Sequence, residues 1–279
     1  MLRYIIESLR RKKARRQFQE YPHQITRFDL PTEGVIEFAN WLNPLVAPKE
    51  IHQEEVDFFK KFIPAGSLVI DIGANIGHLS VAAAVANGKA GLNLAFDPNP
   101  IVFRILQVNA GLNADKTNIH PHNVAITDQE EEFFYRSSEA SFNNGGITKD
   151  NSDFHGRFVL PTKVRGIVLE KFLEEKYPAW MDKMALIKID TEGYDREIIK
   201  SIRNLLTRYQ PTVISECFGK STPEQRREHF EVLADLGYTL YHIDGFRADT
   251  PLTRIDTPAD MNRWKHFDFF AVPMGRQLA

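Results

Sequence analysis

Short runs rich in Val, Ile, Leu and Phe alternate with segments of helical spacing along most of this chain. The runs predict strands, and apolar residues three or four positions apart predict helices. The predicted strands are Ser67–Asp71, Leu92–Asp97, Ile119–Ile126, Ala185–Asp190, Thr212–Cys217, Tyr238–Ile243 and Phe267–Val272. The predicted helices are Glu50–Phe62, Ile76–Asn87, Pro100–Ala110, Asp195–Tyr209 and Pro223–Asp235. Strands that alternate with helices predict a mostly parallel sheet covered on both faces, the doubly wound α/β class.

Two segments depart from this alternation. The N-terminal part, residues 1–48, is expected to be an extension: a helix over Leu2–Phe18 and then an irregular lead-in over Phe28–Pro48, where prolines mark turns. Residues 49–279 form the main domain, into which a region at about 129–178 is inserted. Phe133–Tyr135 and Phe158–Val164 add short strands there, and so long an excursion is typical of a binding loop or lid.

Charge separates the N-terminus from the rest of the chain. The formal net charge of the 279 residues is −2, but residues 1–16 carry seven basic residues and one acidic residue. A terminal helix of this kind either lies on an anionic membrane or an acidic partner, or is a solvated helix packed on the main domain or a second subunit. The acidic main domain argues against nucleic acid as a partner. No apolar run approaches the roughly 20 residues of a membrane span, and no secretory signal is recognised, so we expect a cytoplasmic protein.

The segment Leu68–His78, L-V-I-D-I-G-A-N-I-G-H, is a strand that ends in a carboxylate, a turn with two glycines and the start of a helix. Gly73 permits a tight turn, and Gly77 permits close approach of the helix. A dinucleotide-binding loop would have a glycine at position 75, where pyrophosphate meets the backbone, but this chain has Asn75. The carboxylate of Asp71 suits a cationic ligand, so the pattern favours a phosphate-free cofactor with an ammonium group over NAD.

Two further strands end in acids. Asp97 follows the strand after the glycine turn, where doubly wound folds bind ribose hydroxyls, although it can equally cap the next helix. Asp190 and Glu192 follow the strand Ala185–Asp190 and are expected at the same edge of the sheet. A purely structural alternative stays open, in which these two acids cap the next helix and pair with Lys188.

Three spaced motifs together resemble the FkbM family of methyltransferases. They are D-I-G-A-N-I-G at residues 71–77, F-D-P-N-P at residues 96–100 followed by Asn109, and K-I-D-T-E-G-Y-D at residues 188–195. The match continues through N-V-A-I-T-D at residues 123–128 and a strand that ends with Glu216. Asp97 and Asp195 stand where the family often has Glu, and neither change removes a carboxylate. The resemblance implies a Rossmann-like class I fold, with a seven-stranded, mostly parallel sheet whose last strand is antiparallel.

The resemblance also implies S-adenosylmethionine as the methyl donor and a hydroxyl acceptor, chiefly on sugars, glycans, lipids or natural products. The donor-binding residues that it implies are Asp71, Gly73, Ala74, Asn75 and Gly77 around the methionine part, Asp97 and Pro98 at the ribose, Asn123 and Val124 at the adenine, and Asp190 beside the sulfonium.

Transfer to a hydroxyl requires a base. The candidates, in our order, are Asp190, Glu216, His242 and Glu192, because each is expected at or just beyond a strand end on the cofactor side. No metal is expected: the pair His120 and His122 lacks a third ligand nearby. Two other functions stay open, namely methylation of an amine or a nucleic acid, and a non-catalytic module that keeps the cofactor cradle. The residues after Asp190, Thr-Glu-Gly, disfavour methylation of base amines.

Overall fold

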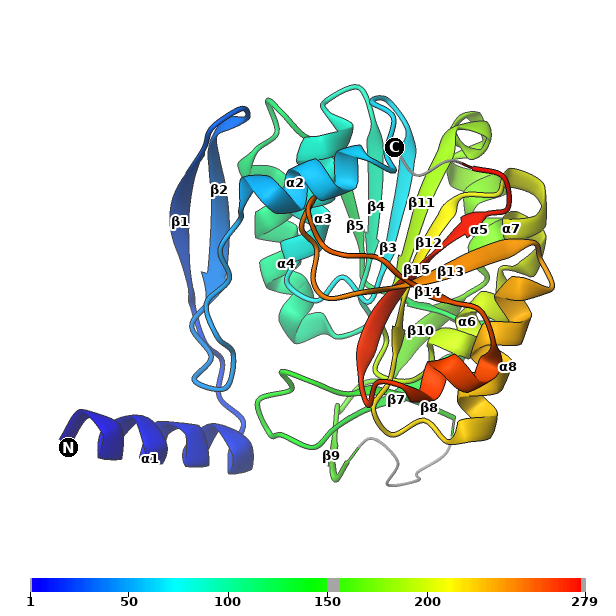
Figure 1. Ribbon diagram of the computed structural model, residues 1–279. Helices are drawn as coiled ribbons and strands as arrows, with labels where there is room; N and C mark the ends of the chain where they lie inside the picture. Colours follow the sequence, from blue (N-terminus) through cyan, green and yellow to red (C-terminus); the bar gives the residue numbers. More distant parts are fainter. Residues whose placement is uncertain (1, 150–155, 277–279) are drawn as a thin grey trace.

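The computed structural model describes residues 2–149 and 156–276. Its centre is an eight-stranded sheet with the order β14-β13-β15-β12-β11-β3-β4-β5 (Figure 1). The strands are β3 (Leu68–Ile72), β4 (Leu92–Phe96), β5 (Ile119–His122), β11 (Met184–Ile189), β12 (Thr212–Cys217), β13 (Tyr238–Ile243), β14 (Thr253–Ile255) and β15 (Phe267–Pro273). Six of the seven predicted strands are confirmed, the first half of the predicted strand Ile119–Ile126 forms β5, and β15 runs antiparallel to both neighbours. The short β14 was not predicted.

Helices cover both faces of this sheet, which confirms the doubly wound class. One face carries α2 (Gln53–Lys60), α3 (His78–Asn87) and α4 (Pro100–Leu112). The other carries α5 (Leu169–Lys176), α6 (Asp195–Ser201), α7 (Arg203–Tyr209) and α8 (Pro223–Ala234). Successive residues of a strand pack into opposite cores, as Val69 and Ile70 of β3 do. The predicted helix Asp195–Tyr209 is broken at Ile202, and α5 and two 3-10 turns, Pro178–Lys183 and Pro258–Asn262, were not predicted.

The prediction of an irregular lead-in over Phe28–Pro48 was wrong. Strands β1 (His23–Leu30) and β2 (Gly34–Trp41) form an antiparallel hairpin, and Pro31 lies in its turn. The buried face of β2 joins the α3–α4 core. Asn109 of α4 accepts a hydrogen bond from the amide of Ala39 at 2.6 Å and donates to the carbonyl of Ile76 at 2.7 Å. A buried asparagine thus ties the hairpin to the glycine turn.

The inserted region is a second, five-stranded sheet, not a loop alone. It consists of β6 (Ala125–Ile126), β7 (Glu132–Ser137), β8 (Gly146–Thr148), β9 (Phe158–Val159) and β10 (Val164–Ile167). The predicted strand Phe133–Tyr135 is confirmed as β7, and Phe158–Val164 divides between β9 and β10. The predicted strand Ile119–Ile126 also divides, because β5 ends at His122 and β6 pairs with β10. Figure 1 shows this sheet across the edge of the main sheet.

Helix α1 (Leu2–Arg16) confirms the predicted N-terminal helix and points away from the body of the protein (Figure 1). Its C-terminal end is anchored, because the carbonyl of Arg15 accepts a hydrogen bond from the amide of Ala140 at 3.1 Å. The aromatic ring of Phe18 packs edge-on against Phe142. The exposed apolar residues of α1 are Tyr4, Ile5, Ile6 and Leu9. In the described residues, no helix is long and apolar enough to cross a membrane.

Candidate functional site

The strand order reverses between β3 and β11, and this switch point is where open α/β sheets bind ligands. Gly73, just after β3, has a φ of +79°, and a Cβ added there would lie 1.8 Å from the carbonyl oxygen of Asp190. Only glycine fits this left-handed conformation and this close approach. The two loops are therefore pressed together, with Asp190 next to the glycine turn, as predicted.

A hollow, which we call the switch-point cavity, opens beside this contact. It measures about 780 Å³ when the open solvent at its mouth is included. Of the predicted site residues, those that line it are Gly73, Asn75, Asp97, Pro98, Asp190 and Glu192. Asn143 and Asn144 of the inserted region also line it. The structure thus brings together residues from three separate motifs.

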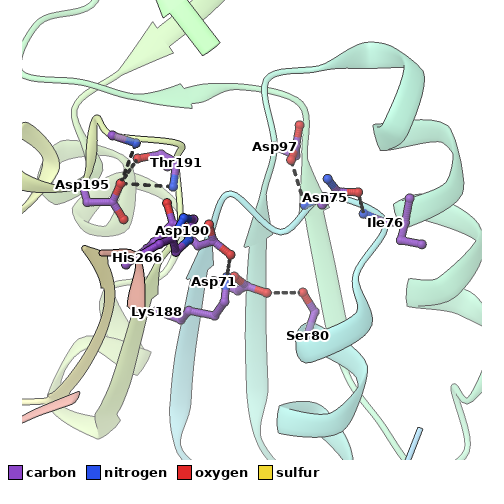
Figure 2. Close-up of polar contacts among 12 residues, drawn as sticks. Asp71, Asn75, Ile76, Ser80, Asp97, Lys188, Asp190, Thr191, Asp195 and His266 are labelled. Atoms are coloured by element: carbon purple, nitrogen blue, oxygen red, sulfur yellow. Dashed lines mark hydrogen bonds and ion pairs between the residues drawn. The ribbon is translucent and has the colours of Figure 1, made fainter. Parts of the chain in front are cut away.

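Asp97 lines the cavity and is hydrogen-bonded to the backbone of two turns. Its two carboxylate oxygens accept hydrogen bonds from the amides of Asn75 at 2.8 Å and Asn99 at 2.9 Å (Figure 2). The N-cap of α4 is Asn99, so Asp97 supports the turn before the helix rather than capping it. Burial raises the pKa of Asp97 to about 7, although the two backbone hydrogen bonds oppose the shift.

Asn75 explains how the turn works without a second glycine. Its φ is +51°, a left-handed conformation that asparagine tolerates better than most residues. Its side-chain oxygen accepts a hydrogen bond from the amide of Ile76 at 2.8 Å. The side chain therefore supports the turn itself, at the position where a dinucleotide-binding loop needs open backbone.

Asp71 already has a cationic partner within the protein. Its carboxylate accepts hydrogen bonds from Lys188 at 3.1 Å and from the hydroxyl of Ser80 at 2.5 Å, and it is almost fully buried (Figure 2). Burial alone would lower the pKa of Lys188, but Asp71 and Asp190 together hold it well above its usual range. Lys188 also lies 3.5 Å from Asp190, so the pairing between Lys188 and Asp190 that the sequence left open is present.

A second hollow lies on the hairpin side of this pair. It is lined by Asp71, Ala74, Lys188 and Asp190 together with the loop residues Val46 and Lys49. The N-terminal extension therefore contributes a wall near Asp190.

Three of the residues assigned by resemblance lie differently. Gly77, with a φ of +89°, starts α3, and an added Cβ would lie 2.7 Å from Leu106, so its closest neighbour is a core side chain. Asn123 donates from its side chain to the carbonyl of Asp97 at 2.8 Å. Val124 packs against the core, and the next residues, Ala125 and Ile126, line the switch-point cavity in its place.

Acidic side chains crowd the end of β11 and its neighbours. Asp195 accepts hydrogen bonds from the hydroxyl of Thr191 at 3.0 Å and from the amide of Gly193 at 3.3 Å, so it holds the turn that carries Glu192 (Figure 2). Burial and then the charge of Asp190 raise the pKa of Asp195 to about 7 and that of Glu192 above its usual value. Glu192 has a φ of +56°, which marks this turn as strained.

Glu216 has a partner that the sequence reasoning missed. His266 Nε2 lies 2.6 Å from Glu216 Oε1. Burial raises the pKa of Glu216 to about 9, and the charges of Asp190, Asp195 and Glu192 add to the effect. His266 immediately precedes β15, and because that strand is antiparallel, its start lies at the edge where the other strands end. The predicted antiparallel last strand was the signal that could have found it.

His242 is not brought to this cluster. It lies on β13, which is separated from β12 by β15, and its ring stacks on Trp264 with centroids 3.9 Å apart. In the described chain, His120 and His122 both contact the hydroxyl of Tyr177, and no group of three potential metal ligands is found.

A third hollow, the outer cavity, lies on the other side of Glu192. Glu192, Asn144 and Gly145 line both it and the switch-point cavity, so the two adjoin. Its other side chains include Ser138, Phe218, Lys220 and Gln225. The predicted loop Ser141–Gly146 thus contributes Asn144 and Gly145 to a hollow rich in hydroxyl, amide and charged groups.

Comparison with known proteins agrees with the motifs. The family model of the methyltransferase FkbM domain matches residues 71–240. Methyltransferase sdnD of Sordaria araneosa is 25% identical over 166 residues, which are 50% of this chain and 62% of the relative, so the chain spans less than two thirds of that protein.

Two solved structures are similar at lower identity. The methyltransferase FkbM of Methylobacillus flagellatus is 15% identical with a TM-score of 0.44, over 76% of this chain and 47% of that one. A SAM-dependent O-methyltransferase of Thermotoga maritima is 13% identical with a TM-score of 0.41, over 92% and 79% of the two chains. The family model spans more than half of the chain, from Asp71 in β3 to Leu240 in β13, and the chain therefore belongs to the FkbM methyltransferase domain family.

Proposed function

We propose that this protein transfers the methyl group of S-adenosylmethionine to a hydroxyl group of a sugar or glycan. The observation that carries the proposal is the junction at Glu192, next to Asp190. There a cavity suited to a nucleoside adjoins a second one lined by polar side chains. The donor would be held on one side of this junction and the acceptor on the other.

The switch-point cavity fits the donor. Each Asp97 oxygen accepts one backbone hydrogen bond and has a second lone pair for a ribose hydroxyl. Ala125, Ile126 and Val102 supply apolar walls for an adenine ring. When bound, S-adenosylmethionine supplies a methyl group on a positively charged sulfur. The carboxylate of Asp190, at the mouth of the glycine turn, favours that charge and can also orient the acceptor hydroxyl.

The outer cavity fits a sugar. Ser138, Asn144 and Gln225 offer hydroxyl and amide groups that can hydrogen-bond to several hydroxyls. The ring of Phe218 offers an apolar surface for the face of a sugar ring. Outside its first 16 residues the chain carries a net negative charge, which disfavours a nucleic acid as the acceptor. The cytoplasmic location expected from the sequence stays a prediction.

The test combines binding and turnover. We expect S-adenosylmethionine to raise the melting temperature and NAD at the same concentration to leave it unchanged. We then expect labelled methyl groups to appear on an oxygen of nucleotide sugars, lipid-linked glycans or small phenols. Stabilisation by NAD alone would contradict the donor, and methylation only of amines or RNA would contradict the acceptor. Donor binding without transfer to any acceptor would favour a non-catalytic module.

A further inference from the structure

We propose that His266, oriented by Glu216, is the base that takes the proton of the acceptor hydroxyl. The inference rests on the function proposed above and names a residue for one step of it. The juxtaposition that carries it is a half-exposed imidazole hydrogen-bonded to a buried carboxylate at the edge of the sheet where the two cavities adjoin.

The pair has the geometry of an oriented base. The bond between His266 Nε2 and Glu216 Oε1 is 2.6 Å long. Glu216 is 8% exposed, so its carboxylate has little access to water, whereas the side chain of His266 is 53% exposed. A buried carboxylate on one ring nitrogen fixes the ring and stabilises the imidazolium that forms when the other nitrogen takes a proton.

The second ring nitrogen is kept open by a glycine. A Cβ added at Gly219 would lie 3.4 Å from His266 Nδ1 and 3.2 Å from its Cβ. Any larger side chain at position 219 would therefore cover Nδ1. With glycine there, an acceptor hydroxyl can approach that nitrogen.

The pair also lies beside the junction of the cavities. Ile189 of β11 pairs with Ser215 of β12, so the next residues along these parallel strands, Asp190 and Glu216, are neighbours at the edge of the sheet. The rings of His266 and Phe218 pack edge-on with centroids 6.1 Å apart, and Phe218 lines the outer cavity.

Two of the other candidate bases have partners elsewhere. The carboxylate of Asp190 lies 3.5 Å from the ammonium of Lys188 and is already paired with it. His242 is stacked on Trp264, away from the acidic cluster.

Atoms and electrons balance in the proposed step. The acceptor oxygen forms a bond to the methyl carbon, the bond between that carbon and sulfur breaks with its electron pair left on sulfur, and the hydroxyl proton moves to His266 Nδ1. Nε2–H meanwhile donates to Glu216, and the proton on Nδ1 leaves to solvent through the exposed side of the ring.

The pair should control the pH dependence of turnover. Burial raises the pKa of Glu216 to about 9, so the pair holds one extra proton at neutral pH. Proton transfer requires Glu216 as a carboxylate and Nδ1 unprotonated, so kcat should rise as the pH approaches 9 and the pair loses that proton. The acids around Glu216 are Asp190, Asp195, Glu192 and Asp268, and their charges favour its protonated form. Lys188 opposes the rise in the pKa of Asp268, and Lys220 opposes that of Glu192.

The test compares His266→Gln, Glu216→Gln and Gly219→Val with a matched control, His23→Gln, whose residue lies on the exposed start of β1. We expect His266→Gln to lower kcat by about 10²-fold or more and to abolish its rise with pH. Glu216→Gln should lower kcat about tenfold and shift the rise, and Gly219→Val should act like His266→Gln. Donor affinity, measured by calorimetry, should stay within about twofold in all four variants.

Nitrogen-15 NMR of the wild-type histidines gives a readout that needs no turnover. We expect His266 to carry its proton on Nε2 and none on Nδ1 when the ring is neutral, and the opposite tautomer would overturn the inference. Wild-type kcat and pH profile in His266→Gln would overturn it too, while the proposed function would stand. Absence of transfer by the wild type to any hydroxyl acceptor would instead overturn the proposed function.

Discussion

The ammonium of Lys188 lies 3.1 Å from the carboxylate of Asp71, and both side chains are buried beneath the glycine turn. This pair joins β3 to β11 at the switch point, where each strand ends and a loop that lines the cavity begins. Removing one partner of a buried ion pair strongly destabilises a protein, because the remaining charge is then buried without its partner.

We therefore expect Lys188→Met to destabilise the protein by about 3–5 kcal/mol, because it leaves Asp71 buried without its cation. Urea unfolding measures this. Adding Asp71→Leu should recover part of the loss, since the double variant no longer buries an unpaired charge. If Lys188→Met alone unfolds like the wild type, the ion pair has no structural importance.

The glycine at position 73 gives a second prediction. Gly73→Ala forces a Cβ to within 1.8 Å of the Asp190 carbonyl oxygen and needs a φ of +79°, so the two loops must separate. We expect donor affinity to fall at least tenfold and the melting temperature to drop. Gly111→Ala, in α4, is the control, because its added Cβ has nothing within 4 Å. Equal donor binding by both variants would refute the close approach.

Strands and turns could be predicted from the sequence where the local backbone conformation requires a particular residue type or pattern. β3, β4, β11 and β12 are apolar runs buried on both faces, so their hydrophobic pattern predicted them. The hairpin was missed because β1 is largely exposed and β2 is buried mainly over residues 38–41, so neither gives a long apolar run. The prolines of this segment were correctly interpreted as turn residues. Because they suggested an irregular segment, the strands on either side of them were not predicted.

The site shows the same division. Gly73, Asn75 and Asp97 line the switch-point cavity, and the sequence pointed to them because a switch point restricts which residues can occupy the turn after each strand. Lys188 could not be assigned to Asp71, because that pairing depends on the register of β3 against β11, which the sequence does not encode locally. His266 was missed for the same reason: its neighbour Glu216 is 50 residues away in the chain.

Asp190→Asn separates orientation from proton removal. We expect kcat to fall on the order of 10²-fold while the fold is kept, because asparagine keeps the shape but loses the charge that favours the sulfonium. The pH profile of the residual activity should keep its rise, since His266 is still present. A loss confined to donor affinity would make Asp190 a donor ligand only. Activity should also survive EDTA, and abolition by EDTA with rescue by magnesium would recast Asp190 as a metal ligand.

The buried acids make stability depend on pH. Glu216 has a pKa of about 9 in the folded protein, against 4.5 as its ordinary value, so the folded state binds its proton more tightly than the unfolded state. Its contribution to stability is full below about pH 4.5 and is lost as the pH rises to about 9. Glu216→Gln, which is neutral at every pH, should therefore melt on the order of 5 °C above the wild type at pH 9 and close to it at pH 5. Glu54→Gln, at an exposed position of α2, is the control. Parallel melting curves of wild type and Glu216→Gln across this range would refute the shift.

The last prediction concerns α1. Its basic residues from Arg10 to Arg16 follow the exposed apolar residues Tyr4, Ile5, Ile6 and Leu9, and its free part points away from the main sheet. In a helix surrounded by water, this exposed apolar stripe has no stabilising contact. On an anionic membrane surface, the apolar residues can insert among the lipids and the basic residues can interact with the headgroups.

We expect the full chain to co-sediment with vesicles containing anionic lipid, and removal of residues 2–16 to abolish this while donor affinity stays unchanged. Two variants separate the apolar contribution to vesicle binding from the electrostatic one. Replacing Ile5, Ile6 and Leu9 by serine removes the apolar part, and replacing the basic residues by glutamine removes the part that salt screens. Each should weaken vesicle binding on its own, because a short apolar stripe and a polybasic segment are individually weak anchors. Vesicle binding that survives the truncation would assign it to another surface, and equal binding to neutral vesicles would remove the electrostatic half of the explanation.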